Sequence, residues 1–154
     1  MKLYESKIIN VECDGIITKE VKKTIYKGLE VYAVKRSRGE GRHIDSIPTA
    51  WWCGYVEVPL DMYKTLKPRG YLDISILYKL DDLAIVHGGY TYLNYGIPLV
   101  LVDDRRLFLG WDYNHWLDTE DCVTYQEILK EGMKVIDSML APKSRDEKVT
   151  KKDV

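Results

Sequence analysis

The chain has few cysteines, a single phenylalanine and no long apolar run. Its three cysteines, Cys13, Cys53 and Cys122, are an odd number at wide spacing, which excludes a disulfide framework and a CxxC metal site and predicts buried free thiols. No apolar stretch approaches the roughly 20 residues of a membrane span, and the N-terminal residues lack the apolar core of a secretory signal. We therefore expect a cytoplasmic protein.

A charge excess of either sign is also missing. The formal net charge of −1 at pH 7 gives no overall attraction to nucleic acid or to an anionic membrane. We therefore expect no membrane partner, and nucleic acid is disfavoured as a partner. Internal repeats are absent, and a length of 154 residues predicts one domain. We place this domain at residues 1–141 and expect the charged tail, residues 142–154, to be disordered.

Alternation of apolar and polar residues predicts a sheet, most clearly at residues 29–36 and 51–58. On the second segment one face would carry Trp52, Val56 and Val58, and the other Trp51, Cys53, Tyr55 and Glu57. Further strands are predicted at residues 2–12, 71–78 and 83–87, a hairpin between 98–102 and 106–111, and a helical turn within 60–66. Residues 18–28 fit either a short helix or a strand.

Residues 124–141 predict an amphipathic helix. Thr124 and Glu127 form a capping-box pattern, apolar residues recur at helical spacing, and Pro142 ends the segment. The predicted fold class is α+β, a mostly antiparallel sheet with a C-terminal helix packed on one face.

Twelve tyrosines and four tryptophans give the chain many side chains with an apolar body and a polar tip, which suit both core positions and ligand walls. Several lie in residues 87–92 and 110–118, beside paired glycines and titratable groups. This combination is typical of a polar pocket. The candidate ligand-binding residues are His87, Gly88, Gly89, Thr91, Tyr92, Trp111, Asp112, His115 and Asp118.

Three strings resemble a family of small phage and bacterial proteins: WCGYVEVP at 52–59, HGGYTY at 87–92 and LGWDYNHWLD at 109–118. Family members show CGYV-x-VP, HGG-x-T-[YF] and [WF]-x-G-F-D-x-x-H-x-x-D, and end in a helix. Trp111 stands here in place of the usual Phe, and the segment from Tyr92 to Leu107 is longer. The resemblance implies a host-takeover or counter-defence role, in the host cytoplasm if a phage encodes the protein, and implies no mechanism.

Asp112, His115 and Asp118 are spaced three residues apart, so a helical turn would place them near one face. With His87 they could form a two-histidine, one-carboxylate set that suits Fe(II), Mn or Zn. Alternatively, Asp112 accepts backbone N–H groups of a turn and His115 packs on Trp116. We expect no cofactor and assign no metal ligands and no catalytic residues.

Three other features have both a functional and a structural interpretation. Gly88 and Gly89 either let the backbone approach a phosphate or oxyanion, or form a bulge that makes room for Trp111. The basic stretch at residues 35–43 is a phosphate clamp, a protein-binding loop or a solvated loop. Cys53 is either a nucleophile paired with His87 or a core residue.

The function expected from these residues is non-covalent binding of a small polar, nucleotide-like ligand. Trp111 and Tyr92 would stack on the ligand, and the remaining candidate residues would bind its polar groups. Such pockets can lie between the subunits of a homo-oligomer. Two alternatives stay open: a metal-dependent phosphodiester hydrolase, and a protein–protein inhibitor of a host enzyme.

Overall fold

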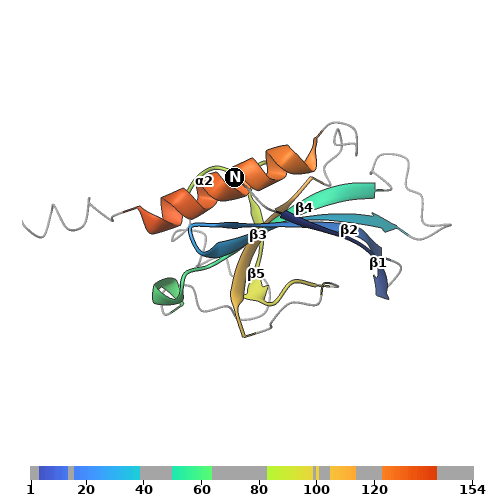
Figure 1. Ribbon diagram of the computed structural model, residues 1–154, viewed down its shortest axis with the longest axis horizontal. Helices are drawn as coiled ribbons and strands as arrows, with labels where there is room; N and C mark the ends of the chain where they lie inside the picture. Colours follow the sequence, from blue (N-terminus) through green and yellow to red (C-terminus); the bar gives the residue numbers. More distant parts are fainter. Residues whose placement is uncertain are drawn as a thin grey trace, which may run out of the picture.

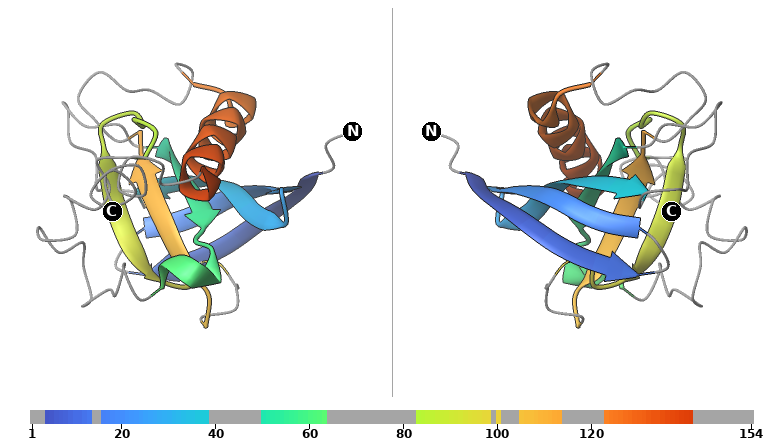
Figure 2. Two further views of the ribbon diagram at one scale, coloured as in Figure 1. Left: turned by 90° about the vertical axis from the view of Figure 1, so that its left-hand side faces the viewer. Right: turned by 90° about the vertical axis from the view of Figure 1, so that its right-hand side faces the viewer.

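The computed structural model describes residues 4–13, 16–38, 50–63, 83–98, 100, 105–113 and 123–141, with the backbone alone for residues 4–13. Six antiparallel strands form a sheet in the order β1-β2-β3-β4-β6-β5, and helix α2 (Tyr125–Leu140) lies across one face (Figures 1 and 2). This confirms the predicted α+β fold. The strands are β1 (Tyr4–Cys13), β2 (Ile16–Tyr26), β3 (Leu29–Arg38), β4 (Ala50–Glu57), β5 (Tyr90–Tyr95) and β6 (Leu107–Asp112).

Residues 18–28, which fitted a helix or a strand, belong to β2 and to the turn that follows it. Lys27 and Gly28 both have positive φ angles, 51° and 81°, as the two central residues of a type I′ hairpin turn require. This turn pairs β2 with β3 over the whole length of β2. Strand β3 extends to Arg38, so Ser37 and Arg38 are strand residues rather than the loop residues that the sequence predicted.

The predicted strand at residues 83–87 is wrong, because β5 begins only at Tyr90. A turn precedes it, in which the Gly89 N–H donates to the Val86 carbonyl at 3.0 Å. Gly88 and Gly89 have φ angles of 68° and 82°, which favour glycine.

The predicted hairpin between residues 98–102 and 106–111 is also wrong. A strand has only two hydrogen-bonding edges, and β6 pairs with β4 on one edge and with β5 on the other. The helical turn expected within residues 60–66 is the short 3-10 helix η1 (Leu60–Met62). The strand predicted at 71–78 and the tail at 142–154 lie outside the described residues.

Helix α2 begins where its cap predicts. The Thr124 hydroxyl accepts the Glu127 N–H at 3.3 Å, which satisfies one of the free donors of the first turn. The apolar stripe of α2 packs on β2, β3 and β4. At the contact, a Cβ on Gly132 would lie 2.5 Å from Val31, so only glycine allows this close approach. No helix among the described residues is long and apolar enough to span a membrane.

Two glycines on the central strands make room for two large rings on opposite faces. Gly54 lies opposite Trp111 in the β4–β6 pairing, and Tyr55 lies opposite Gly110. A Cβ on Gly54 would lie 2.4 Å from the Trp111 ring, and one on Gly110 would lie 2.6 Å from the Tyr55 ring. Each ring therefore covers its cross-strand glycine, Trp111 on the side of α2 and Tyr55 on the other side.

The sheet separates two buried clusters, as the alternation of β3 and β4 predicted. The helix face, which α2 covers, includes Val31, Ala33, Trp52, Val56, Leu109 and Trp111. We call the opposite side the far face; it includes Val21, Tyr32, Val34, Trp51, Cys53, Tyr55, Ile97 and Phe108. Both faces of the central strands are therefore buried.

Candidate functional site

The far face carries ionisable side chains at both ends of β3. Because neighbouring residues of a strand point to opposite faces, Glu30, Tyr32, Val34, Arg36 and Arg38 all point to the far face. Six residues at about 3.3 Å each separate Glu30 from Arg36 by about 20 Å. The strand thus places an acidic group at one end of this face and two guanidinium groups at the other.

Among the described residues, Arg36 is the most deeply buried cation of this face, with only 5% of the residue exposed. Its Nη1 donates to the Thr18 hydroxyl at 3.0 Å. Its Nη2 donates to the Tyr55 hydroxyl at 3.1 Å and to the Pro98 carbonyl at 2.6 Å. All three acceptors are neutral, and none of the ion pairs between described residues includes Arg36.

Aromatic and thiol groups surround this guanidinium. It lies 5.9 Å from the Tyr55 ring centroid, and the neighbouring Arg38 lies 4.6 Å from that of Trp51. Burial raises the pKa of the Cys53 thiol to about 11, against an opposing effect of Arg36. Burial likewise raises the pKa of Tyr92 to about 12, again with Arg36 opposing. At neutral pH these groups are neutral, so they add no negative charge beside Arg36.

Tyr92 joins this region from β5. Its hydroxyl donates to the Gly96 carbonyl at 2.8 Å, and its ring meets the edge of Tyr55 at a centroid distance of 5.4 Å. Gly96 and Pro98 therefore both offer carbonyl groups to far-face side chains. Among the described candidate ligand-binding residues, Tyr92 and Asp112 lie in this region: Arg36 opposes the rise in the pKa of Tyr92, and the Asp112 carboxylate acts electrostatically on the Cys53 thiol.

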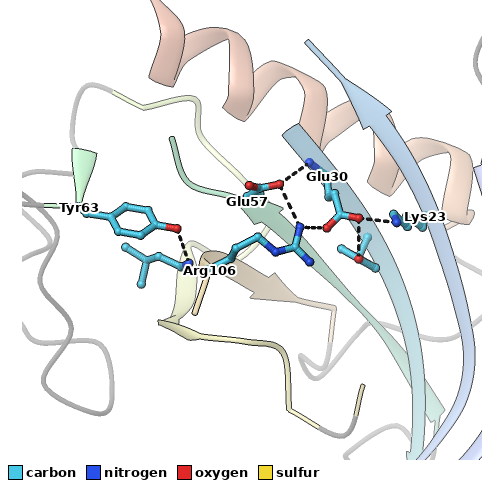
Figure 3. Close-up of polar contacts among 7 residues, drawn as sticks. Lys23, Glu30, Glu57, Tyr63 and Arg106 are labelled. Atoms are coloured by element: carbon cyan, nitrogen blue, oxygen red, sulfur yellow. Dashed lines mark hydrogen bonds and ion pairs between the residues drawn. The ribbon is translucent and has the colours of Figure 1, made fainter. Parts of the chain in front are cut away.

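The other end of the far face holds a charge-balanced cluster, shown in Figure 3. Glu30 forms ion pairs with Lys23 and Arg106, and Arg106 also lies 3.4 Å from Glu57. The Glu57 carboxylate accepts the Glu30 backbone N–H at 3.1 Å. Burial opposes ionisation of Glu30, but hydrogen bonds from Lys23 and Arg106 outweigh it and lower the Glu30 pKa. Two carboxylates and two cations compensate one another here.

The predicted residues His87, Gly88 and Gly89 lie near the N-terminal half of α2, on the helix side of the sheet. The exposed His87 ring stacks on Tyr113 at 4.6 Å and 14°, and its backbone N–H donates to Glu131 at 2.9 Å. Tyr113 in turn accepts the Trp111 indole N–H at 3.2 Å. These contacts attach the glycine turn to the helix and the core.

Trp111 is only 1% exposed and lies under α2, so its ring offers no surface for stacking. It also lies on the opposite face from Tyr92, and the two rings cannot hold one ligand between them as the sequence predicted. The room for Trp111 comes from Gly54, not from Gly88 and Gly89 as one interpretation proposed. Burial of this large aromatic ring stabilises the core instead.

Asp112 follows Trp111 and therefore points to the far face, opposite Cys53 in the β4–β6 pairing. It is separated from His87 by the sheet. Cys53 and His87 are separated in the same way, so they do not form a nucleophile–base pair. Cys53 is a buried free thiol, as predicted. Thr91 is exposed at the bulge where the β5–β6 register shifts.

His115 and Asp118 lie outside the described residues, so the proposed metal set cannot be placed. Within the part of the chain that the structure describes, no group of three or more His, Cys, Asp or Glu side chains could hold a metal ion. The structure thus divides those predicted residues that it describes between two sides of the sheet and does not gather them into one pocket.

Sequence reasoning did not select Arg36 as a site residue, although the basic stretch at residues 35–43 included it as a phosphate clamp. The available signal was the alternation of β3 itself. Continued through residues 36 and 38, it places both arginines on one face and Lys35 on the other, where the Lys35 ammonium lies 5.9 Å from the Trp52 ring. Comparison with family models, curated proteins and solved structures found no match to this chain.

Proposed function

We propose that the protein binds a small, nucleotide-like anionic ligand on the far face, without covalent chemistry. The observation that carries this proposal is the burial of Arg36 beside acceptors that, among the described residues, are all neutral. A guanidinium stays charged in proteins, and burial of a charge is costly unless an opposite charge accompanies it. A bound anion would supply that charge.

The neighbourhood of Arg36 fits this role. Arg38 lies on the same face two residues further along β3, and Trp51, Tyr55 and Tyr92 surround the two guanidinium groups with aromatic rings. Guanidinium groups bind phosphate and carboxylate oxygens strongly, and aromatic rings suit planar ligands such as bases. The role also suits the resemblance to phage proteins, since sequestering a nucleotide is one way to interfere with a host.

Native mass spectrometry of the freshly purified protein tests the proposal, together with thermal melting in the presence of the common nucleoside monophosphates. We expect a mass excess or a rise in Tm for the wild type and neither for Arg36→Gln. Lys134→Gln, which removes one charge from the exposed side of α2, is the control and should behave like the wild type. Equal binding by wild type and Arg36→Gln would contradict the proposal.

A second candidate, inhibition of a host protein through surface contacts, has one observation in its favour. Ile85 is 96% exposed, and it lies two residues before the exposed His87. Apolar side chains this exposed are typical of interaction sites when they are grouped. Replacement of Ile85 by Ser would then abolish partner binding and leave nucleotide binding unchanged. The hydrolase alternative depends on His115 and Asp118, and no observation in the described residues favours it.

A further inference from the structure

Two buried hydroxyl groups meet at the Arg36 guanidinium, one from each neighbouring strand. Thr18 of β2 is 0% exposed and Tyr55 of β4 is 6% exposed. Both hydroxyl oxygens accept a hydrogen bond from Arg36, at 3.0 Å and 3.1 Å. A hydroxyl that accepts through a lone pair still has its own O–H proton to donate.

Neither proton has an acceptor in the part of the chain that the structure describes, where the hydrogen bonds of these two hydroxyls are those that they accept from Arg36. Buried hydroxyl donors are normally satisfied. Arg36 has five N–H groups, and its acceptors among the described residues are Thr18, Tyr55, Pro98 and the Cys53 thiol. Two hydroxyl protons, one from β2 and one from β4, therefore meet beside Arg36 of β3 without an acceptor among the described residues.

We infer that this donor cluster, Thr18, Arg36 and Tyr55, binds the phosphoryl group of a phosphate monoester. This inference rests on the proposed function and specifies which part of the ligand the far face recognises. A phosphoryl group offers three strong acceptor oxygens, and the cluster offers three donor groups on three adjacent strands. The cationic Arg36 balances the charge of the phosphoryl group, and the hydroxyls satisfy oxygens that the guanidinium does not reach.

The test is isothermal titration calorimetry of the full chain with phenyl phosphate, with phenol as the neutral probe and benzoate as the carboxylate probe. We expect phenyl phosphate to bind most tightly and phenol not to bind. Thr18→Val and Tyr55→Phe each remove one hydroxyl and keep the shape of the side chain. Each should weaken phenyl phosphate binding roughly tenfold to a hundredfold, as for hydrogen bonds to charged groups.

Two matched controls introduce the same substitutions at a threonine and a tyrosine outside the donor cluster. Thr24→Val alters a buried threonine of β2 that points to the helix face, because it lies opposite Val31. Tyr32→Phe alters a far-face tyrosine that donates to Glu30 at 3.1 Å. Both controls should bind phenyl phosphate like the wild type. Thr18→Ser keeps the hydroxyl and should also bind it, which shows that loss in Thr18→Val does not come from misfolding.

The outcomes separate this inference from the proposed function. If benzoate binds more tightly than phenyl phosphate, or if Thr18→Val and Tyr55→Phe bind phenyl phosphate like the wild type, the inference is wrong. The proposed function survives in that case if Arg36→Gln still loses the mass excess or the rise in Tm. If Arg36→Gln binds nucleotides as the wild type does, the proposed function fails, and the inference fails with it.

Discussion

The two faces of the sheet differ in what they bury. The helix face buries apolar and aromatic side chains such as Trp111, Val56 and Ile136, which α2 covers. The far face also buries apolar residues, but it includes ionisable groups at both ends of β3, Glu30 and Arg36. Apolar burial stabilises a fold wherever it occurs, whereas buried charge is costly. The helix face therefore accounts for stability, and the far face is where chemistry beyond folding has to be sought.

Within the far face, Arg106 and Arg36 differ in how their charges are compensated. Arg106 lies between Glu30 and Glu57, and its charge is compensated inside the protein. Arg36 has only neutral acceptors among the described residues, namely hydroxyl, carbonyl and thiol groups. The charges around Arg106 neutralise one another, whereas Arg36 keeps a positive charge and N–H donors that a ligand can bind.

The largest expected effect is on the helix face, at Gly54. In Gly54→Ala the new methyl group would lie 2.4 Å from the Trp111 ring and 3.0 Å from Ile128, and the Trp111 ring is only 1% exposed. We expect the free energy of unfolding to fall by about 3 kcal/mol, at the upper end for overpacked cores. Urea denaturation measures it.

Gly89→Ala is the control for this change. Nothing lies within 4 Å of a Cβ at Gly89, and only the φ angle of 82° opposes a side chain. The free energy of unfolding should then fall by about 1 kcal/mol. A Gly54→Ala protein as stable as Gly89→Ala would contradict the tight packing of Trp111 on β4.

The sequence allowed much of the helix face to be predicted. The cap at Thr124, the stripe of α2 and the alternation of residues 51–58 are local patterns, and each is confirmed. Strand pairing could not be predicted from local patterns, because β6 pairs with β4 and β5, whose residues are distant from it in the sequence. The predicted hairpin of residues 98–102 with 106–111 failed for that reason.

The candidate site was less predictable than the fold. Aromatic residues beside charged ones mark a pocket and a core equally well, so Trp111 was selected although it is buried. Alternation puts Trp111 and Asp112 on opposite faces, which already separates them. The surroundings of Arg36, in contrast, which include no ion-pair partner among the described residues, depend on side chains from β2 and β4 and on Pro98, and no local pattern contains that information.

The second-largest loss of stability is expected for a substitution at Arg106. Arg106→Met removes the cation between two carboxylates of which Glu30 is buried, and it removes the contact of the guanidinium with the Phe108 ring at 5.4 Å. We expect the free energy of unfolding to fall by about 2 kcal/mol. This is less than the loss for a fully buried ion pair, because Arg106 is partly exposed. Urea denaturation at pH 7 checks this. An unchanged midpoint would mean that Lys23 alone compensates Glu30.

A smaller effect is expected from pH. Because the folded protein lowers the Glu30 pKa, ionised Glu30 stabilises the fold above the pKa of the unfolded chain. That contribution is lost as the pH falls through the lower, folded pKa. We expect Glu30→Gln to reduce the dependence of stability on pH, measured by urea denaturation between pH 7 and pH 3. Identical pH profiles of variant and wild type would contradict the role of Glu30.

The smallest effect on stability is expected at Arg36, and this tests the difference between the two arginines most directly. Arg36→Met removes a buried charge that forms no ion pair with a described carboxylate, and the gain from its removal offsets the loss of three hydrogen bonds to neutral acceptors. In the absence of ligand, the free energy of unfolding should change by less than about 1 kcal/mol, although the residue is more deeply buried than Arg106. In the presence of nucleotide, only the wild type should gain stability, because ligand binding to the folded state raises the Tm. If Arg36→Met destabilises the ligand-free protein as much as Arg106→Met does, then Arg36 is a structural residue and the two ends of the far face are alike.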